Sequence, residues 1–251
     1  MNASSTVLIL GANSGIARAL CHRLAARKYR LILAARRTEE LETQAADLRI
    51  RHGIEVTCQP FDALDFDGHA AFFERCVQMS AGGLEGVVLA YGSMLPQATT
   101  QTDLAAARQV LDANFTSPVA LLSLAANHME PRHRGWIAAI SSVAGDRGRQ
   151  SNYTYGAAKA GFSCWLQGLR NRLFHHGVHV LTIKPGFVDT PMTHGLLNPK
   201  SPLVATPDKV ARDIDRAIHR RRNILYTPWF WRGILTIIAT IPEALFKRLK
   251  M

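Results

Sequence analysis

The segment LILGANSGIARAL, residues 8–20, joins an apolar run to an amphipathic one through two glycines. Gly11 permits a tight turn after a strand, Gly15 lets the backbone approach a pyrophosphate, and the small Ala17 permits close packing of helix on strand. The N–H groups at the start of the following helix would then face an anion. The pattern predicts a nucleotide-binding turn, although an ordinary turn between strand and helix can also contain two glycines.

Short apolar runs alternate with amphipathic stretches along most of the chain, which is typical of a parallel sheet covered by helices on both faces. Strands are predicted over 6–11, 30–35, 54–59, 86–91, 135–141 and 178–184, with 223–227 as a candidate seventh. Helices are predicted over 16–28, 39–52, 68–79, 104–128, 153–175 and 207–220. The expected fold is α/β, a Rossmann-type doubly wound sheet of about seven strands. We predict one nucleotide-binding domain over 1–227 that contains the active site, with a loop over 187–206 and a hydrophobic appendage over 228–251.

Composition narrows the class of protein. The chain has 251 residues, 47% hydrophobic, with no low-complexity segment, which is enough for one sizeable core and argues against disorder. We expect no signal peptide and a cytoplasmic location, because the first residues lack a basic region followed by a long apolar run. The four cysteines form no CxxC pair, which argues against a disulfide framework and a zinc site. His175, His176 and His179 lack a partner at a zinc spacing, so we expect no metal and interpret them as exposed histidines near a helix end.

A second stretch, SSVAGDRGRQSNYTYGAAK, covers residues 141–159 and suggests chemistry. Tyr155 and Lys159 are four residues apart, on one face of a helix, and Ser142 lies thirteen residues before Tyr155. Tyr153 has no lysine four residues later. A nearby ammonium favours a phenolate and lowers the pKa of a tyrosine. Tyr155 could therefore exchange a proton with the alkoxide that hydride addition creates, while the Ser142 hydroxyl orients the carbonyl.

These patterns resemble the short-chain dehydrogenase/reductase family over about residues 5–195. The family has the same Ser and YxxxK spacing and a GxxxGxG turn, from which this chain departs at Ala17. The resemblance implies hydride transfer between a nicotinamide cofactor and a CH–OH or C=O group. Lys159 would also hold the nicotinamide ribose, and Asn114 would support a water-linked proton relay. The implied catalytic residues are Asn114, Ser142, Tyr155 and Lys159.

The end of the second predicted strand bears on which nicotinamide cofactor binds. Ala35 stands where NAD-binding folds usually place a carboxylate for the ribose 2′-OH. Arg36 and Arg37 follow, and a guanidinium can pair with a 2′-phosphate, so we predict NADP(H). Asp62 matches the adenine-contacting acid of the family. The other implied cofactor contacts are Gly11, Asn13, Ser14, Gly15, Ile16, Gly92, Tyr155, Lys159, Pro185, Gly186, Val188 and Thr190.

Two further segments bear on the substrate. After the fourth predicted strand the family usually has NNAG, whereas this chain has LAYG at 89–92 and keeps only the glycine. LAYG and the YTPWFWR segment at 226–232 resemble the reductase component of the decaprenylphosphoryl-ribose 2′-epimerase system within the family. That resemblance implies a polyprenyl-phosphate-linked 2-keto pentose as substrate and a flavin-dependent oxidase as partner. A ketoreductase of a sterol, sphingoid base or acyl chain, and a non-catalytic nucleotide-binding sensor or scaffold, are the alternatives.

The C-terminal segment, residues 227–250, is rich in apolar side chains and ends in basic residues. Its sequence is TPWFWRGILTIIATIPEALFKRLK. Its apolar run over 229–241 is shorter than the roughly 20 residues that a spanning helix needs. Tryptophans, isoleucines and a basic end suit a segment that lies at a membrane surface, on the inner face. The alternative is that the segment packs on the catalytic domain or on a second subunit of a homo-oligomer.

The formal net charge is +11, and seven of the Lys and Arg residues lie at or after Arg220, with one acid, Glu243. A basic surface can meet anionic lipid or an anionic ligand. We expect no nucleic-acid partner, because no zinc-finger, RNA-recognition or helix-turn-helix pattern is present.

Overall fold

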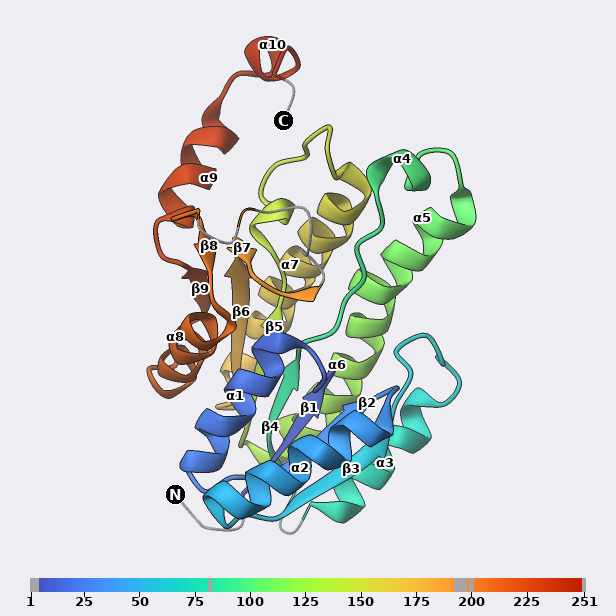
Figure 1. The fold of residues 1–251 in the computed structure, drawn as a ribbon, viewed down its shortest axis with the longest axis vertical. Helices are drawn as coiled ribbons and strands as arrows, with labels where there is room; N and C mark the ends of the chain where they lie inside the picture. The colour runs from blue at the N-terminus through green and yellow to red at the C-terminus, as the bar shows by residue number, and fades with distance from the viewer. Residues whose placement is uncertain (1–4, 81–82, 192–197, 199–200, 250–251) are drawn as a thin grey trace.

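The computed structural model describes residues 5–80, 83–191, 198 and 201–249. Its centre is a seven-stranded parallel sheet with the order β3-β2-β1-β4-β5-β6-β9 (Figure 1). The strands are β1 (Thr6–Leu10), β2 (Arg30–Ala35), β3 (Val56–Pro60), β4 (Leu84–Leu89), β5 (Trp136–Ile140), β6 (His179–Pro185) and β9 (Ile224–Thr227). The predicted doubly wound α/β sheet is confirmed, including its seventh strand.

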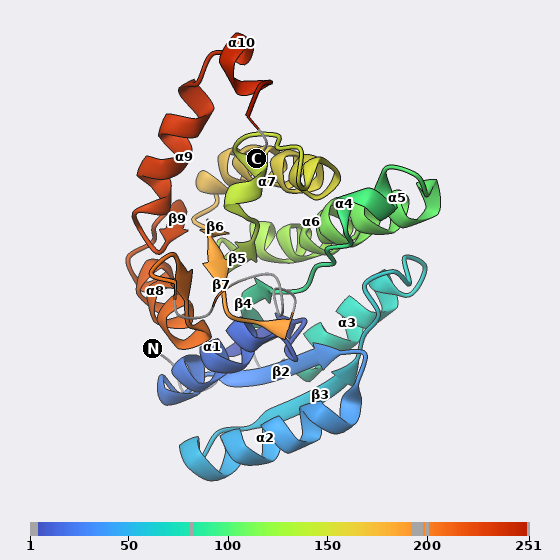
Figure 2. The same cartoon turned by 45° about the horizontal axis from the view of Figure 1, so that its top comes forward.

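Helices cover both faces of the sheet because its strands carry apolar side chains on alternate sides. Val7 and Ile9 belong to the core cluster on one face, and Leu8 and Leu10 belong to the cluster on the other. The first face is covered by α1 (Gly15–Ala26), α2 (Thr38–His52) and α8 (Pro207–His219); the second by α3 (His69–Met79), α6 (Ser117–Met129) and α7 (Tyr153–Phe174) (Figure 2).

The strand order reverses beside β1, which pairs with β2 on one side and with β4 on the other. In open parallel sheets this reversal leaves a crevice outside the carboxyl ends of the strands, where ligands bind. The segments after β1, β4, β5 and β6 all leave the sheet at this end. They carry most of the residues that the sequence singled out.

The predicted helix over 104–128 is wrong in one respect, because it is interrupted. It divides into α5 (Leu104–Leu111), the π-helical turn η1 (Asp112–Thr116) and α6. Pro118 has no N–H group, so it cannot donate to the carbonyl of Asn114 four residues earlier. Asn114 lies in this wider turn and is fully buried.

Two other predictions need correction. The predicted loop over 187–206 contains a two-stranded parallel sheet, β7 (Phe187–Val188) with β8 (Val204–Ala205). The prediction of an exposed His179 is wrong, since the residue is buried and its ring Nε2 lies 2.9 Å from the Arg222 carbonyl oxygen. It begins β6, so its backbone position in the sheet fixes its burial.

The C-terminal segment forms α9 (Trp231–Thr240) and the short α10 (Glu243–Phe246), which extend beyond the sheet (Figure 1). The short helix α4 (Gln97–Thr100) and the 3₁₀ turns η2 (Glu130–Arg132) and η3 (Val143–Gly145) complete the elements of the described residues. Among those residues no helix is long and apolar enough to cross a membrane.

Candidate functional site

The glycine turn after β1 has the geometry that the sequence predicted. Gly11 has a φ of +82°, and a Cβ at this position would lie 2.7 Å from the Cβ of Tyr91, so the turn requires glycine. The Ser14 hydroxyl accepts a hydrogen bond from the Ala17 N–H at 3.2 Å and caps α1. The first N–H groups of a helix have no intrahelical acceptor and can meet a phosphate, so the turn fits a pyrophosphate.

A basic cluster lies beside this turn. The Asn13 side chain donates to the Arg37 carbonyl at 3.1 Å and ties the turn to the end of β2. Arg37 pairs with Glu40 at 2.9 Å, whereas Arg36 is exposed and has no ion pair within the described part of the chain. Arg18 also pairs with Glu40, at 2.6 Å, and its Nε donates to the Asn13 carbonyl. Arg36 is therefore the arginine of this cluster that can take an anionic partner next to the turn, such as the 2′-phosphate of NADP(H).

Arg18 was not singled out from the sequence. Its position in the sequence could have indicated a role beside the turn, because Arg18 lies three residues after Gly15, one turn into the predicted helix. Asp62 follows β3 as expected and is exposed, and its Oδ1 accepts from the Leu64 N–H at 3.0 Å. The carboxylate therefore lies at the carboxyl end of the sheet.

The segment after β4 packs tightly against two predicted catalytic residues. A Cβ on Gly92 would lie 2.6 Å from Asn114 Oδ1 and 3.6 Å from Lys159 Nζ. The glycine of LAYG is therefore needed for close packing. The Tyr91 hydroxyl lies 2.8 Å from Ser117 Oγ, and burial raises the pKa of Tyr91.

Asn114 uses its side chain to hold this segment in place. Its Nδ2 donates to the carbonyls of Ser93 at 2.6 Å and Val110 at 2.8 Å, and its Oδ1 accepts from the Ser93 N–H at 3.3 Å. The amide is therefore occupied within the protein. Any role of Asn114 in a water-linked relay falls to its backbone carbonyl, which cannot accept from Pro118.

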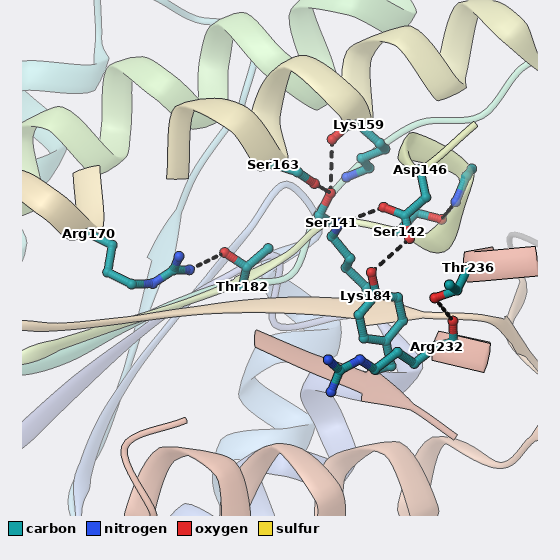
Figure 3. A network of polar contacts seen from close by, with 12 residues as sticks. Ser141, Ser142, Asp146, Lys159, Ser163, Arg170, Thr182, Lys184, Arg232 and Thr236 are labelled. Carbon is teal, nitrogen blue, oxygen red and sulfur yellow. Dashed lines mark hydrogen bonds and ion pairs between the residues drawn. The ribbon is translucent and has the colours of Figure 1, made fainter. Parts of the chain in front are cut away.

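Ser142, Tyr155 and Lys159 come together from β5 and α7. Ser142 directly follows Ser141 at the end of β5, and its Oγ accepts from the Ala144 N–H at 3.0 Å. Lys159 is 2% exposed; its Nζ lies 5.8 Å from the centre of the Tyr155 ring and donates to the Ile140 carbonyl at 3.2 Å. The Ser141 hydroxyl donates to the Lys159 carbonyl at 3.1 Å and joins the end of β5 to α7 (Figure 3). The structure thus brings the three predicted residues to one place.

The protonation of this group differs from the expectation that Lys159 lowers the pKa of Tyr155. Burial raises the pKa of Tyr155 to about 12, and a hydrogen bond with Ser142 only partly opposes it. Burial also lowers the pKa of Lys159 to about 7. A lysine with that pKa is only about half protonated at pH 7, so it offers Tyr155 less than a full positive charge. Desolvation by the protein outweighs the attraction that the spacing suggested.

The turn after β6 is packed against the C-terminal segment. Pro185 ends β6, and the Gly186 N–H donates to the Thr227 carbonyl at 3.1 Å. A side chain at Gly186 would overlap the Trp231 indole, which also meets the Phe187 ring edge-to-face at 5.0 Å. The packing explains why position 186 is glycine and shows that Trp231 lies directly behind this turn.

The other two predicted residues of this region lie beyond the turn. Val188 is in β7 and pairs with Ala205, and the Thr190 methyl lies within about 3.7 Å of where a Cβ on Gly15 would be. The segment that follows β7 therefore approaches the glycine turn after β1 across the crevice. A nicotinamide cofactor that extends from the glycine turn toward this segment fits the arrangement.

The C-terminal segment is attached to the loop that follows Ser142. Trp231 and Leu235 are 4% and 2% exposed and form a small core with Val143. Arg147 donates to the Ala239 and Ile241 carbonyls at 3.4 Å, pairs with Glu243 at 2.6 Å and lies 4.3 Å from the centre of the Phe246 ring. One face of the segment is thus packed on the catalytic domain, as the alternative interpretation of this segment expected.

The opposite face of the same segment is apolar and exposed. Trp229 is 79% exposed, Ile237 68%, Leu245 57% and Leu249 45%. Arg232, Lys247 and Arg248 are exposed beside them, and Lys250 lies outside the described residues.

Comparison with known proteins places the chain among oxidoreductases. Residues 5–200 match the family model described as short chain dehydrogenase. An uncharacterized oxidoreductase of Mycobacterium tuberculosis is 35% identical over 98% of this chain and 97% of its own length. An uncharacterized oxidoreductase of Streptomyces coelicolor is 34% identical over 97% of this chain and 95% of its own length.

Solved structures show the same fold. A short-chain dehydrogenase from Sphingobium yanoikuyae in complex with NADPH has a TM-score of 0.82 at 24% identity, over 96% of this chain and 97% of that one. A single-residue variant of actinorhodin polyketide ketoreductase with NADPH has a TM-score of 0.80 at 23% identity, over 89% of this chain and 95% of that one. At these identities the likeness supports the fold alone.

Proposed function

The chain belongs to the short-chain dehydrogenase family, and we propose that it catalyses NADP(H)-dependent reduction of a ketone, or the reverse oxidation. Family membership indicates a dehydrogenase or reductase. The observation that carries the proposal is the meeting of Ser142, Tyr155 and Lys159 beside Gly92, at the carboxyl end of the sheet. A protein that only bound a nucleotide would have no chemical use for this arrangement.

Bound NADPH would supply the hydride, and the protein's residues would manage the proton. Tyr155 stays protonated at neutral pH, because its pKa is raised to about 12, so it can donate to the developing alkoxide. The Ser142 hydroxyl, which lies close enough to Tyr155 to lower its pKa, would orient the substrate carbonyl. Lys159, with its pKa near 7, can both hold and release a proton near neutral pH and can restore the proton that Tyr155 loses.

The preference for NADP(H) is supported by the basic cluster. Arg36 is exposed and has no ion pair among the described residues, while Arg18 and Arg37 share Glu40. A 2′-phosphate would give Arg36 a charge-assisted partner. Two proteins of this fold, from Sphingobium yanoikuyae and from the actinorhodin system, were solved with NADPH.

The finer proposal for the substrate is a polyprenyl-phosphate-linked 2-keto pentose. Its support is the LAYG segment, the C-terminal segment and Arg149. Arg149 lies on the loop between Ser142 and Tyr155; its Nε is buried and has no hydrogen-bond partner within the described residues. Burial lowers the pKa of Arg149, which indicates a desolvated cation that an anionic substrate would stabilise.

A lipid-type ketone is the main alternative substrate, and the exposed apolar face of the C-terminal segment is compatible with either. The two can be separated by comparing a phosphate-bearing keto sugar with a neutral lipid ketone. Arg149→Met should raise KM for the first substrate only. If the substrate is the keto sugar, a flavin-dependent oxidase would supply it, so the neighbouring genes are informative.

We also propose that the exposed face of the C-terminal segment, residues 229–249, contacts an anionic membrane surface. Trp229, Ile237 and Leu245 supply apolar area, and the one acid of this segment, Glu243, is paired with Arg147. The test is flotation with anionic vesicles at low salt. Replacing the three exposed side chains with serine should abolish the vesicle-bound fraction, and it leaves the buried Trp231 and Leu235 in place. Equal flotation of both proteins, or none of either, would contradict the contact.

The decisive experiment for the proposed reaction is an assay of NADPH oxidation with a panel of ketones, in parallel with NADPH binding. Turnover that disappears in Tyr155→Phe would support the proposal. Tight NADPH binding without turnover of any ketone or alcohol in the panel would instead favour a sensor or scaffold.

A further inference from the structure

A buried ion pair lies next to the predicted catalytic residues but belongs to none of the roles assigned so far. Lys184 Nζ lies 2.5 Å from Asp146 Oδ1, and the two side chains are only 10% and 12% exposed (Figure 3). The Tyr226 hydroxyl donates to the other carboxylate oxygen of Asp146 at 3.0 Å. Both oxygens of Asp146 are therefore engaged.

The three residues come from three segments that meet near the carboxyl ends of β5, β6 and β9. Asp146 lies four residues after Ser142, on the same loop. Lys184 directly precedes Pro185, which begins the turn after β6. Tyr226 directly precedes Thr227, whose carbonyl accepts the Gly186 N–H at 3.1 Å. The cluster thus connects the Ser142 loop to the turn after β6, where we expect contacts with the nicotinamide cofactor.

The chemistry of the cluster favours one geometry. A buried carboxylate and ammonium stabilise each other only at close range and in a fixed orientation, so any shift of the loop would leave a desolvated charge unpaired. Burial and the Asp146 carboxylate raise the pKa of Tyr226 to about 12, so at neutral pH the phenol remains a hydrogen-bond donor. Because desolvation offsets most of the attraction, such a pair adds little net stability.

We propose that Asp146, Lys184 and Tyr226 are positioning residues, which fix the distance between the Ser142 hydroxyl and the turn at Pro185 and Gly186. Ser142 would orient the ketone, and the turn would hold the group that donates the hydride. A small change in their separation would misalign the reacting atoms, and such errors can cost on the order of a hundredfold in rate. The inference rests on the proposed reductase function.

The test compares two variants. Lys184→Met leaves the buried Asp146 carboxylate without its cationic partner, and the double substitution Asp146→Leu with Lys184→Met removes both charges. Measured quantities are kcat and KM for the ketone, the Kd for NADPH, and the thermal unfolding midpoint. Lys184→Met should lower kcat at least about tenfold, with the Kd for NADPH within about threefold of wild type. The double variant should recover the unfolding midpoint but not kcat.

The controls separate positioning from folding. Lys184→Arg keeps the ion pair and should retain most of kcat, and Tyr226→Phe should show a smaller loss than Lys184→Met. Arg51→Met removes an exposed ion pair with Asp47 on α2 and should change nothing. If Lys184→Met does not fold, the double variant alone provides the comparison.

Two results would overturn the inference in distinguishable ways. The cluster would have only a structural role if the double variant kept the wild-type kcat. The same would follow if the loss of kcat paralleled the loss of the unfolding midpoint across all variants. Absence of any turnover in the wild-type protein would overturn the proposed function together with the positioning role.

Discussion

The glycine turn after β1 and the segment after β6 approach each other where Gly15 lies near Thr190, but the protein holds them by different means. On the β1 side the site consists of backbone geometry and exposed charges, such as Gly11 and Arg36. On the β6 side it consists of buried side chains, such as Trp231 at 4% exposure and the Asp146–Lys184 pair. Substitutions on the first side should change ligand preference, whereas those on the second should change stability and the alignment of groups.

The largest expected effect is a loss of kcat from a substitution at Tyr155, which lies on neither of these two sides. Tyr155→Phe removes one hydroxyl and keeps the ring, so it should lower kcat by about 10²–10⁴-fold with nearly unchanged NADPH affinity. Steady-state kinetics and a fluorescence titration of NADPH measure the two quantities. Tyr153→Phe is the matched control, because this side chain is 45% exposed and should matter little. More than about a hundredth of the wild-type rate in Tyr155→Phe would contradict the assignment.

On the packed side we expect a loss of stability. Trp231→Ala removes a buried indole that supports the turn after β6, and such substitutions typically cost about 3–5 kcal/mol of unfolding free energy. Urea unfolding measures the loss. Trp229→Ala removes a side chain that is 79% exposed and should change stability by no more than about 0.5 kcal/mol. Equal losses of unfolding free energy in the two variants would contradict the assignment of Trp231 to a packed face and Trp229 to an exposed one.

On the charged side we expect a change in cofactor preference with no loss of stability. Arg36→Ala should weaken NADPH binding by about 1–3 kcal/mol and leave NADH binding unchanged. Titration of each cofactor gives the two affinities. Arg37→Ala should have a smaller effect, because Arg37 already pairs with Glu40 at 2.9 Å. Equal losses for NADPH and NADH would show that Arg36 does not meet the 2′-phosphate.

The smallest predicted effect is a pH dependence at the junction of the two sides. The pKa of Lys159 is lowered from 10.5 to about 7, so between these values the unfolded chain binds a proton that the folded protein lacks. The free energy of unfolding should therefore rise with pH, by up to about 1.4 kcal/mol between pH 7 and pH 8. Tyr155, with its pKa raised from 10.0 to about 12, has a comparable influence only above about pH 10, where its slope is of the opposite sign.

Lys159→Met should remove this pH slope, as measured by urea unfolding at several pH values without added cofactor. Lys28→Met, at an exposed position, is the control and should keep it. Parallel curves for Lys159→Met and wild type would show that the folded protein keeps Lys159 protonated.

The sheet and most of its helices could be predicted from the sequence because their signals are local. Alternating apolar runs fix the strands, and the glycine turn and the YxxxK spacing each lie within a few residues. The interruption at η1 could not be seen in periodicity, because the π turn covers only five residues of a long apolar stretch and only Pro118 marks it. His179 lay within the predicted strand over 178–184, but its burial also depends on a contact with Arg222, which is far away in the sequence.

The C-terminal side was harder to predict because its contacts join residues far apart in the chain. Arg147 and Glu243, or Asp146 and Lys184, are ordinary charged residues until the fold brings them together. The sequence of the C-terminal segment therefore fits two interpretations, and the structure shows a packed face and an exposed face on one helix. The roles of the site residues, the division at residue 227 and a homo-oligomer stay predictions.

The packing of Trp231 against Gly186 also gives the protein an optical reporter. Indole emission overlaps the absorption of reduced nicotinamide, and the transfer of excitation depends steeply on the distance between the two rings. Trp231, which contacts position 186, should therefore lose emission when NADPH binds at this turn. The difference between the emission spectra of wild type and Trp231→Phe would therefore report the binding of NADPH near this turn in the absence of substrate.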